Sequence, residues 1–571
     1  MKNKINHINI SLFLLTGLLL SSVSLFSQEV NDNEEITVVA PYQPTVSDAF
    51  KINISPRIPD EKLEKPKFNY EPIEKTLSLP AQLEPIVPAR IEGESVSKLY
   101  KNYIRAGFGN YGTPYIEFFA NKLRSKKNAF GVHIKHISHS GKIKDFAYPG
   151  NSHSSVDFYG KKFLKKHTFS ADVFAKRDGY HFYGYRPDDF PELDLEKKDI
   201  KQNYTLFGVN TAFESNYTRE QSLHHNIGFN YYYLFDRAES TEHNIHFMLD
   251  LDKKMEFFSF SEMEKLGLNG DVNFYLNNDT INGSFNSGLT TIAPYYSLQF
   301  DQYLFRVGVN TAIQSDSGVS VHVYPELRLE VKVVEDYLIT YAGIDGRMEQ
   351  NSLRSFSDEN PFINSALPKQ FTNYKSRQFG GLKGRITKYL DYNVSFMNST
   401  ISDMPLFVND TASVIAPGLN NQFTVIYDRV KYTRLLAEFG FHYKSKFNAI
   451  LSGQYNNYFL DNEDKAWHKP GLELKLATEY TMQEKILLRL EILNRSSSYA
   501  KLYETEANDE IKVVAQKING FTDVNLGVEY RYNQALSGFI SMNNLLSQRQ
   551  YLWYNYPSYR FNVLLGATYS F

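Results

Sequence analysis

The chain has 571 residues and a formal net charge of -2, and 22% of its residues are charged. So balanced a charge provides no bulk electrostatic attraction to nucleic acid or to an anionic membrane surface, and we expect no nucleic-acid partner. The sequence contains no Cys, which excludes disulfides, thiolate metal sites and a catalytic thiol. Aromatic residues reach 15%, as 41 Tyr and 42 Phe against 2 Trp, and the mean hydropathy is -0.41. This low value is compatible with a membrane protein whose strands turn only alternate residues toward lipid.

The first 28 residues have the layout of a secretory signal peptide. Lys2 and Lys4 precede a largely apolar run over residues 8–20, and a Ser-rich stretch ends near Gln28. The apolar run is shorter than the roughly 20 residues that a membrane-spanning helix needs. We therefore predict a cleaved signal peptide, residues 1–28, rather than an uncleaved anchor.

Residues 29–98 hold nine of the 21 prolines, with Lys and Glu between them. Proline fixes φ and removes a backbone donor, so neither a long helix nor a central strand can form there. We predict an extended arm, which either occupies a lumen as a minimal plug or reaches toward a periplasmic partner. The prolines are Pro41, Pro44, Pro56, Pro59, Pro66, Pro72, Pro80, Pro85 and Pro88.

From residue 99 to residue 571, apolar and polar residues alternate in segments separated by short turns or polar loops. This period of two is typical of β-strands. Leu474 and Val528 lie on the apolar faces of two such segments, opposite Glu473 and Glu529. In the last segment only Leu564 breaks the alternation. The apolar face of that segment is Phe561, Val563, Leu565, Ala567, Tyr569 and Phe571.

A soluble β-sandwich would alternate in the same way, so length must discriminate. Sandwich domains rarely exceed about 250 residues, whereas the pattern here runs through residues 99–571 without an internal boundary. A closed barrel also leaves no strand edge unpaired, which lipid requires. We therefore predict an all-β fold, an antiparallel transmembrane β-barrel of about 20 to 22 strands in the bacterial outer membrane, where single-chain barrels have even strand numbers.

Longer polar segments predict extracellular loops, and tight turns predict periplasmic connections. The predicted loops are residues 142–151, 184–198, 355–374, 462–469 and 503–510, and the predicted tight turns are residues 481–485 and 532–535. Clusters of Tyr and Phe over residues 231–235 and 551–559 are typical of the aromatic girdles at the two membrane interfaces.

The polar faces of several predicted strands carry charges of both signs. We expect these charges to face the lumen, where cross-strand ion pairs fill or line it without strong charge selectivity. A sugar-phosphate porin would show an excess of Arg and Lys instead. The charges are Glu326, Arg328, Glu330, Lys332, Glu473, Lys475, Arg489, Glu491, Glu529 and Arg531.

No motif predicts catalysis. The sequence has no Gly-x-Ser-x-Gly elbow and no spacing that singles out a Ser–His–Asp triad, so we predict no enzyme and no cofactor. His133, His136 and His139 suggest a metal cluster, but on a strand His136 points to the opposite face from the other two. At most two of them converge, and we predict no metal site.

The C-terminal region resembles that of TonB-dependent receptors. Residues 520–530 run GFTDVNLGVEY, residues 541–546 run SMNNLL, and residues 562–571 run NVLLGATYSF. Those receptors carry an Asn-Leu pair near the end of the barrel and an aromatic residue at the chain terminus. The resemblance implies a receptor-like barrel engaged in transport across, or partner-gated assembly in, the outer membrane.

The terminal segment is also similar to the signal that the barrel assembly machinery reads. The resemblance implies contact with that machinery during biogenesis and with outer-membrane lipid afterwards. The residues of this signal are Val563, Leu565, Ala567, Tyr569 and Phe571.

A second resemblance follows the signal peptide, where residues 34–40, EEITVVA, are similar to a TonB box. The likeness implies strand addition to TonB or to another periplasmic or envelope protein. Between Ala40 and the first predicted strand near Tyr100 lie only about 55 residues, too few for the globular plug of such receptors. A scaffold barrel that docks an envelope protein through the arm and a passive porin therefore remain alternatives. The box-like residues are Glu35, Ile36, Thr37, Val38 and Val39.

Overall fold

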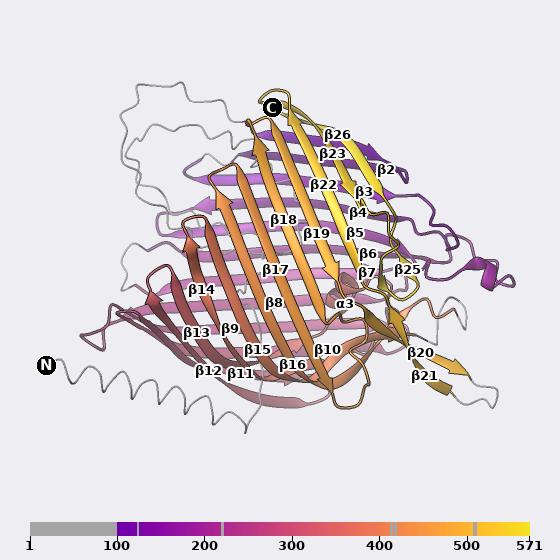
Figure 1. Ribbon diagram of the computed structural model, residues 1–571. Helices are drawn as coiled ribbons and strands as arrows, with labels where there is room; N and C mark the ends of the chain where they lie inside the picture. The colour runs from indigo at the N-terminus through magenta and orange to yellow at the C-terminus, as the bar shows by residue number, and fades with distance from the viewer. Residues whose placement is uncertain (1–99, 123–124, 218–221, 411–414, 416–418, 506–510) are drawn as a thin grey trace.

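Figure 1 shows a computed structural model of the chain. The structure describes residues 100–122, 125–217, 222–410, 415, 419–505 and 511–571. The predicted signal peptide, the predicted arm and the box-like segment lie outside these residues. Among the described residues, no helix combines the length and the apolar character needed to cross a membrane.

Twenty-two strands form one sheet, and four further strands form two small hairpins. The first eleven strands of the sheet are β1 (Asn102–Gly109), β2 (Thr113–Lys122), β3 (Asn128–His139), β4 (Asn151–Phe163), β5 (His167–His181), β6 (Lys201–Ser215), β7 (His224–Asp236), β8 (Thr241–Met255), β9 (Met263–Asp279), β10 (Gly283–Phe300) and β11 (Tyr303–Ser315). The other eleven are β12 (Val319–Val334), β13 (Leu338–Gln350), β14 (Phe371–Thr387), β15 (Leu390–Asn409), β16 (Phe423–Tyr443), β17 (Phe447–Leu460), β18 (Leu472–Met482), β19 (Ile486–Arg495), β22 (Phe521–Arg531), β23 (Leu536–Asn543) and β26 (Asn562–Ser570). The hairpins are β20 (Ser498–Thr505) with β21 (Ile511–Ile518) and β24 (Tyr551–Trp553) with β25 (Tyr556–Pro557), and the helical segments are α3 (Leu353–Glu359) and η1 (Pro187–Asp189).

The sheet closes on itself. Each barrel strand pairs antiparallel with its neighbours, and β1 pairs with β26 along a seam. The backbone N–H groups of Lys101 and Asn102 both donate to the carbonyl of Phe571, at 3.1 and 2.9 Å. A side chain at Gly566 would lie 2.2 Å from the Ala106 carbonyl, so glycine permits the close approach of the two strands. The predicted closed antiparallel barrel is confirmed, with 22 strands.

The outer surface of the barrel is apolar. Leu327, Leu474 and Leu565 are 40%, 42% and 55% exposed, and their neighbours along each strand face the other way; these neighbours are polar or small except for Leu564. A ring of exposed Val, Leu and Phe side chains would be a liability in water, but in lipid it is the favourable surface. The chain is thus a barrel of the bacterial outer membrane.

The two ends of the barrel differ. The end that holds the start of β1 and the end of β26 carries short connections, such as residues 301–302 and 388–389. The opposite end carries long ones, including residues 182–200, 351–370 and 544–561, and Figure 1 shows α3, β25 and the β20–β21 hairpin there, away from the C-terminus. Outer-membrane barrels have short periplasmic turns and longer extracellular loops, so we name the loop-rich end the outer end.

Two features of the outer end differ from the sequence predictions. The connection over residues 410–422 was not predicted, and residues 551–559 do not form an aromatic girdle at strand ends. Tyr556 lies in a connecting loop and is only 3% exposed. The girdle prediction was wrong at this point because aromatic residues near strand ends look alike in sequence whether they meet lipid or fold over the barrel.

Strand length varies around the ring. At the seam β1 has 8 residues and β26 has 9, whereas β15 has 20 and β16 has 21. About 9 to 11 residues suffice to cross the membrane, so β15 and β16 continue well beyond it. Their extra length supplies one side of the structure that covers the outer end.

Candidate functional site at the outer mouth

A buried apolar cluster crosses the outer end, and we call it the mouth core. Tyr204 and Tyr232 of β6 and β7 belong to it, and so do Phe407 and Phe423 of β15 and β16. Since β6 and β15 are nine positions apart in a ring of 22 strands, the cluster reaches from one wall to the nearly opposite one. Its buried members are Tyr204, Leu206, Tyr232, Leu234, Leu353, Phe356, Ile363, Leu367, Phe407, Phe423, Val425 and Tyr556.

Several loops meet on Tyr556. Its ring stacks on Phe362 with centroids 3.7 Å apart and meets Tyr183 edge-on at 4.9 Å. Its hydroxyl donates to the carbonyl of Asn421, and the Tyr183 hydroxyl donates to the carbonyl of Pro557 at 2.9 Å. The loops involved are residues 182–200, 351–370 and 544–561, together with the described residues 419–422 of the connection between β15 and β16. Because they arise at separate points of the ring, they meet over the middle of the mouth.

The loop that carries α3 is fastened to the barrel wall by Glu242, a fully buried residue of β8. Its carboxylate accepts from the backbone N–H groups of Leu353 and Arg354, at 2.6 and 3.2 Å, and from the Tyr232 hydroxyl at 2.8 Å. These donors compensate the buried charge and satisfy N–H groups at the start of α3 that have no partner within the helix.

A second set of contacts holds the far end of the same loop. Ser365 donates to Asp236, which also accepts from Gln202 at 3.0 Å. The Lys369 ammonium lies 4.0 Å from Asp279. Burial lowers the pKa of Lys369, while Glu242, Asp279 and Asp236 oppose that shift. The loop is therefore held at both ends by side chains of the wall.

His468, in the loop after β17, is buried against Phe423 of the mouth core and is 2% exposed. Its Nδ1 lies 3.0 Å from the Phe407 carbonyl, and the backbone N–H of Tyr554 points at Nε2 from 3.5 Å. One ring nitrogen thus faces an acceptor and the other a donor, an arrangement that fits only the neutral imidazole. Burial lowers the pKa of His468 to about 3.

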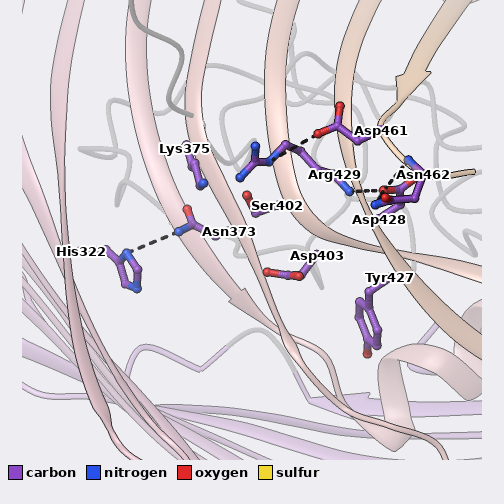
Figure 2. A pocket seen from close by; sticks show the side chains of 10 residues that line it. All are labelled: His322, Asn373, Lys375, Ser402, Asp403, Tyr427, Asp428, Arg429, Asp461 and Asn462. Atoms are coloured by element: carbon purple, nitrogen blue, oxygen red, sulfur yellow. Dashed lines mark hydrogen bonds and ion pairs between the residues drawn. The ribbon is translucent and has the colours of Figure 1, made fainter.

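Beside the mouth core lies a polar cavity of about 500 Å³, which Figure 2 shows from close by. It is lined by His322, Asn373, Lys375, Ser402, Asp403, Tyr427, Asp428, Arg429, Asp461 and Asn462, from β12, β14, β15, β16 and the loop after β17. Asp428 has a structural role, because it accepts from the backbone N–H groups of Asn462 and Glu463 at 3.0 and 2.8 Å. Arg429 lies 3.8 Å from Asp461.

Two β-bulges shape this cavity. The register of β14 shifts at Lys375, and that of β15 shifts at Ser402 and Asp403. Asp403 has a φ of 58°, which is uncommon for a residue other than glycine. The Ser402 hydroxyl is buried without a hydrogen-bond partner among the described residues. Bulges often re-aim side chains beside functional sites, and here they leave Lys375, Ser402 and Asp403 lining the cavity.

The ten predicted lumen charges lie on the polar faces of β12, β18, β19 and β22. The opposite faces of β12, β18 and β22 carry exposed apolar residues, whereas in β19 the apolar residues of the opposite face are half-buried. Glu326 pairs with Arg306 at 2.6 Å, and Glu330 lies 2.9 Å from Lys383 and 3.8 Å from Arg328. The other contacts join Arg489 to Glu479 at 3.1 Å, Glu473 to Arg495 at 4.0 Å and Glu529 to the Ser537 hydroxyl at 2.8 Å. Lys332, Lys475, Glu491 and Arg531 share this face. These strand faces thus carry charges of both signs, and their exposure to the lumen stays a prediction.

In the predicted assembly signal, Leu565, Ala567, Tyr569 and Phe571 are exposed on the lipid face and Val563 is half-buried. Leu564, the exception to the alternation, packs inside the barrel against Tyr115 and Phe539. The box-like residues Glu35 to Val39 lie outside the described part of the chain.

Two histidines of β3, His133 and His136, make polar contacts with side chains of neighbouring strands. His133 Nε2 lies 3.0 Å from Glu117, its Nδ1 lies 3.6 Å from Asp157, and its ring stacks on Phe119 at 3.9 Å. His136 meets the Ser154 hydroxyl at 2.8 Å. Within the described ranges no group of three or more His, Cys, Asp or Glu residues is placed to hold a metal ion.

The mouth core was missed from the sequence. Its members belong to predicted strands and loops that gave no sign of meeting. One signal was available: the chain has only two Trp, Trp467 and Trp553, and both fall in connections between barrel strands. Trp467 is 1% exposed, and Trp553 packs against Phe407 and Phe423.

Comparison with solved structures identifies the architecture. The described barrel aligns with the pyoverdine outer-membrane receptor FpvA of Pseudomonas aeruginosa PAO1 at a TM-score of 0.61 and 11% identity, over 84% of this chain and 79% of that one. The siderophore receptor PirA of Acinetobacter baumannii gives 0.62 and 9%, over 84% and 81%. The ferric-catecholate import receptor Fiu of E. coli K12 gives 0.59 and 10%, over 83% and 82%.

The barrel has the fold of TonB-dependent receptors. No protein-family model and no curated protein sequence matches the chain. At identities of 9 to 11% the likeness concerns the fold. The receptor-like barrel predicted from the C-terminal motifs is therefore confirmed as an architecture, and its role is taken up next.

Proposed function

We propose that this protein is a partner-gated transporter of the outer membrane, in which the mouth core is the gate and the polar cavity beside it holds an incoming polar solute. The observation that carries the proposal is the wall-to-wall span of the mouth core. A solute entering along the axis must displace packed aromatic rings. The fastenings at Glu242 and Asp236 make that displacement a movement of whole loops rather than of single side chains.

The same observation weighs against a passive porin, whose lumen stays open to water. The lumen wall adds support, because its charges are paired within the protein rather than gathered in one sign. Residues 34–40 resemble a TonB box, which makes them a candidate for the segment that binds the periplasmic partner. A scaffold role is the competing reading, in which the covered mouth never opens.

Planar-bilayer conductance tests the gate. The full-length chain is expected to show almost no steady current. A variant in which residues 353–368 are replaced by a short Gly-Ser linker removes α3 and its fastenings, and it is expected to conduct steadily. Large steady currents from the intact protein would contradict the proposal. The scaffold role would be favoured by two results together: the loop variant conducts in the bilayer, but the intact protein passes no solute in cells.

The partner is tested separately with the purified C-terminal domain of TonB. The intact protein in detergent should bind this domain, and deletion of residues 34–40 should abolish binding and the growth phenotype that depends on the protein. Deletion of residues 60–66, in the same Pro-rich region, is the matched control. Unchanged binding and growth after the first deletion would remove TonB as the partner while leaving the conductance result to decide on the gate.

A further inference from the structure

A buried glutamate stands on the lipid side of the barrel, near the periplasmic end. Glu264 of β9 alternates in phase with Leu266, which is 49% exposed on the outer surface, whereas Lys265 between them pairs with Asp252 at 3.3 Å on the lumen side. Glu264 is nevertheless 0% exposed. A carboxylate facing hydrocarbon without partners would be costly, so something must cover it.

The turn between β8 and β9 covers it. The Glu264 carboxylate accepts from the backbone N–H groups of Phe257 and Phe258, both at 2.8 Å, and from the Tyr296 hydroxyl of β10 at 2.9 Å. The Ser261 hydroxyl also donates to it. The turn therefore folds back over the outer surface of the barrel, and Glu264 pins it there.

The folded turn presents aromatic rings outward. Phe257, Phe258 and Phe260 are 61%, 47% and 60% exposed. They continue into the aromatic surface of the barrel, since Phe257 lies 6.2 Å from the Tyr296 ring and Phe260 lies 5.7 Å from the Phe300 ring. The patch is thus continuous with the surface that already meets lipid.

The backbone of the turn is prepared for a medium poor in water. Beyond the two N–H groups on Glu264, the Ser261 N–H donates to the Phe258 carbonyl at 3.2 Å and the Glu262 N–H donates to the Gln299 carbonyl at 2.9 Å. Backbone groups that meet hydrocarbon must be paired within the protein, and these pairings meet that requirement. The flanking Lys253, exposed on the same face, suits lipid phosphates.

We propose that the β8–β9 turn is a lipid anchor, whose Phe257, Phe258 and Phe260 insert into the periplasmic leaflet of the outer membrane and whose shape depends on Glu264. The occupant of this aromatic patch is lipid rather than a protein partner. The anchor fixes the depth of one side of the barrel and is independent of whether the mouth opens.

The Cys-free chain allows a direct test. Phe260→Cys is labelled with an environment-sensitive NBD probe, and the protein is refolded into phosphatidylethanolamine/phosphatidylglycerol vesicles that contain brominated lipids. Quenching should be at least about threefold stronger than for a probe at Ser445→Cys, in the Lys-flanked turn after β16 at the same end of the barrel. Since the vesicles hold no other protein, equal and weak quenching at the two sites would overturn the proposal.

A second variant tests the pin. In the Phe260→Cys background, Glu264→Ala frees the turn, so quenching should fall toward the Ser445→Cys level while the barrel still shows its folded mobility on a gel. Retained full quenching would refute the role of Glu264. If Glu264→Ala does not assemble, Ser261→Ala, which removes one donor from the carboxylate, takes its place and should give a partial loss.

Discussion

The barrel is closed in two places by different means. At the seam, β1 and β26 are joined by backbone hydrogen bonds that repeat along both strands, and Gly566 lets them approach. At the mouth, closure depends on individual side chains such as Phe362 and Tyr556, which reach each other from separate loops. Backbone N–H and C=O groups that lose their partner in lipid find no other hydrogen-bond partner there. Aromatic rings that separate at the mouth become exposed to water, which has a finite cost in free energy. The seam is therefore the permanent closure, and the mouth is the one that we propose to open.

The largest effect is expected at the seam. Deleting Phe571 removes the carbonyl that accepts from Lys101 and Asn102 and removes the end of the predicted assembly signal. We expect almost complete loss of assembled barrel, measured as heat-modifiable mobility of outer-membrane fractions. Tyr569→Phe, which keeps the apolar pattern, is the control and should assemble normally. Wild-type levels of the deletion variant would show that the terminal residue is dispensable for closure.

A smaller and local effect is expected at the mouth. Tyr556→Ala removes the ring on which Phe362 and Tyr183 pack, and truncation of a buried aromatic side chain costs about 3–5 kcal/mol. The barrel should assemble, because the seam is untouched, but it should show frequent channel openings in a planar bilayer. Tyr532→Ala, at an exposed turn of the other end, is the matched control. Identical silent traces for both variants would mean that Tyr556 does not hold the mouth closed.

The contrast between repeated backbone pairing and individual side-chain contacts also explains which features could be predicted from the sequence. The alternation of Leu565, Ala567 and Tyr569 is a local property, so the strands, the closed ring and the lipid face follow from sequence. Leu564 departs from this alternation for a reason that lies elsewhere in the chain. It packs against Tyr115 and Phe539, which only the closed ring brings next to it. Periodicity assigns a side chain to a face, but it cannot name its partner across the sheet.

The mouth shows the limit most clearly. Glu242 lies in a strand and binds the start of α3 more than a hundred residues later, a pairing that no spacing rule encodes. The cavity is similarly hidden, because bulges at Lys375 and Asp403 shift the register and cannot be located from apolar periodicity. The box-like segment is a sequence motif that stays a prediction.

A charged substitution in a barrel strand tests which side chains face lipid. Leu474→Lys places an ammonium on the exposed apolar face and should cost about 2–4 kcal/mol near the midplane, whereas Glu473→Lys on the lumen side should be much milder. Urea titration of the barrel refolded in lipid vesicles measures both. Single Cys replacements at the two positions add a second readout: a lipophilic thiol probe should label position 474, and a polar reagent should label position 473. Equal reaction of both with the polar reagent would contradict the membrane-spanning assignment.

The smallest effect concerns the mouth alone and depends on pH. In the closed mouth His468 is neutral with a pKa of about 3, and on opening it regains access to water and an ordinary value near 6.5. The open state therefore binds more protons between these values, so closure is fully stable above about pH 6.5 and weakens as the pH falls, by about 2 kcal/mol at pH 5. Protonation at Nε2 would also set a donor against the Tyr554 N–H. Bilayer recordings should show opening about 25-fold more often at pH 5 than at pH 7, and His468→Gln, which cannot titrate, should flatten that slope whatever its absolute level of opening. An equal slope in the two proteins would assign the acid response to other groups and leave His468 as packing only.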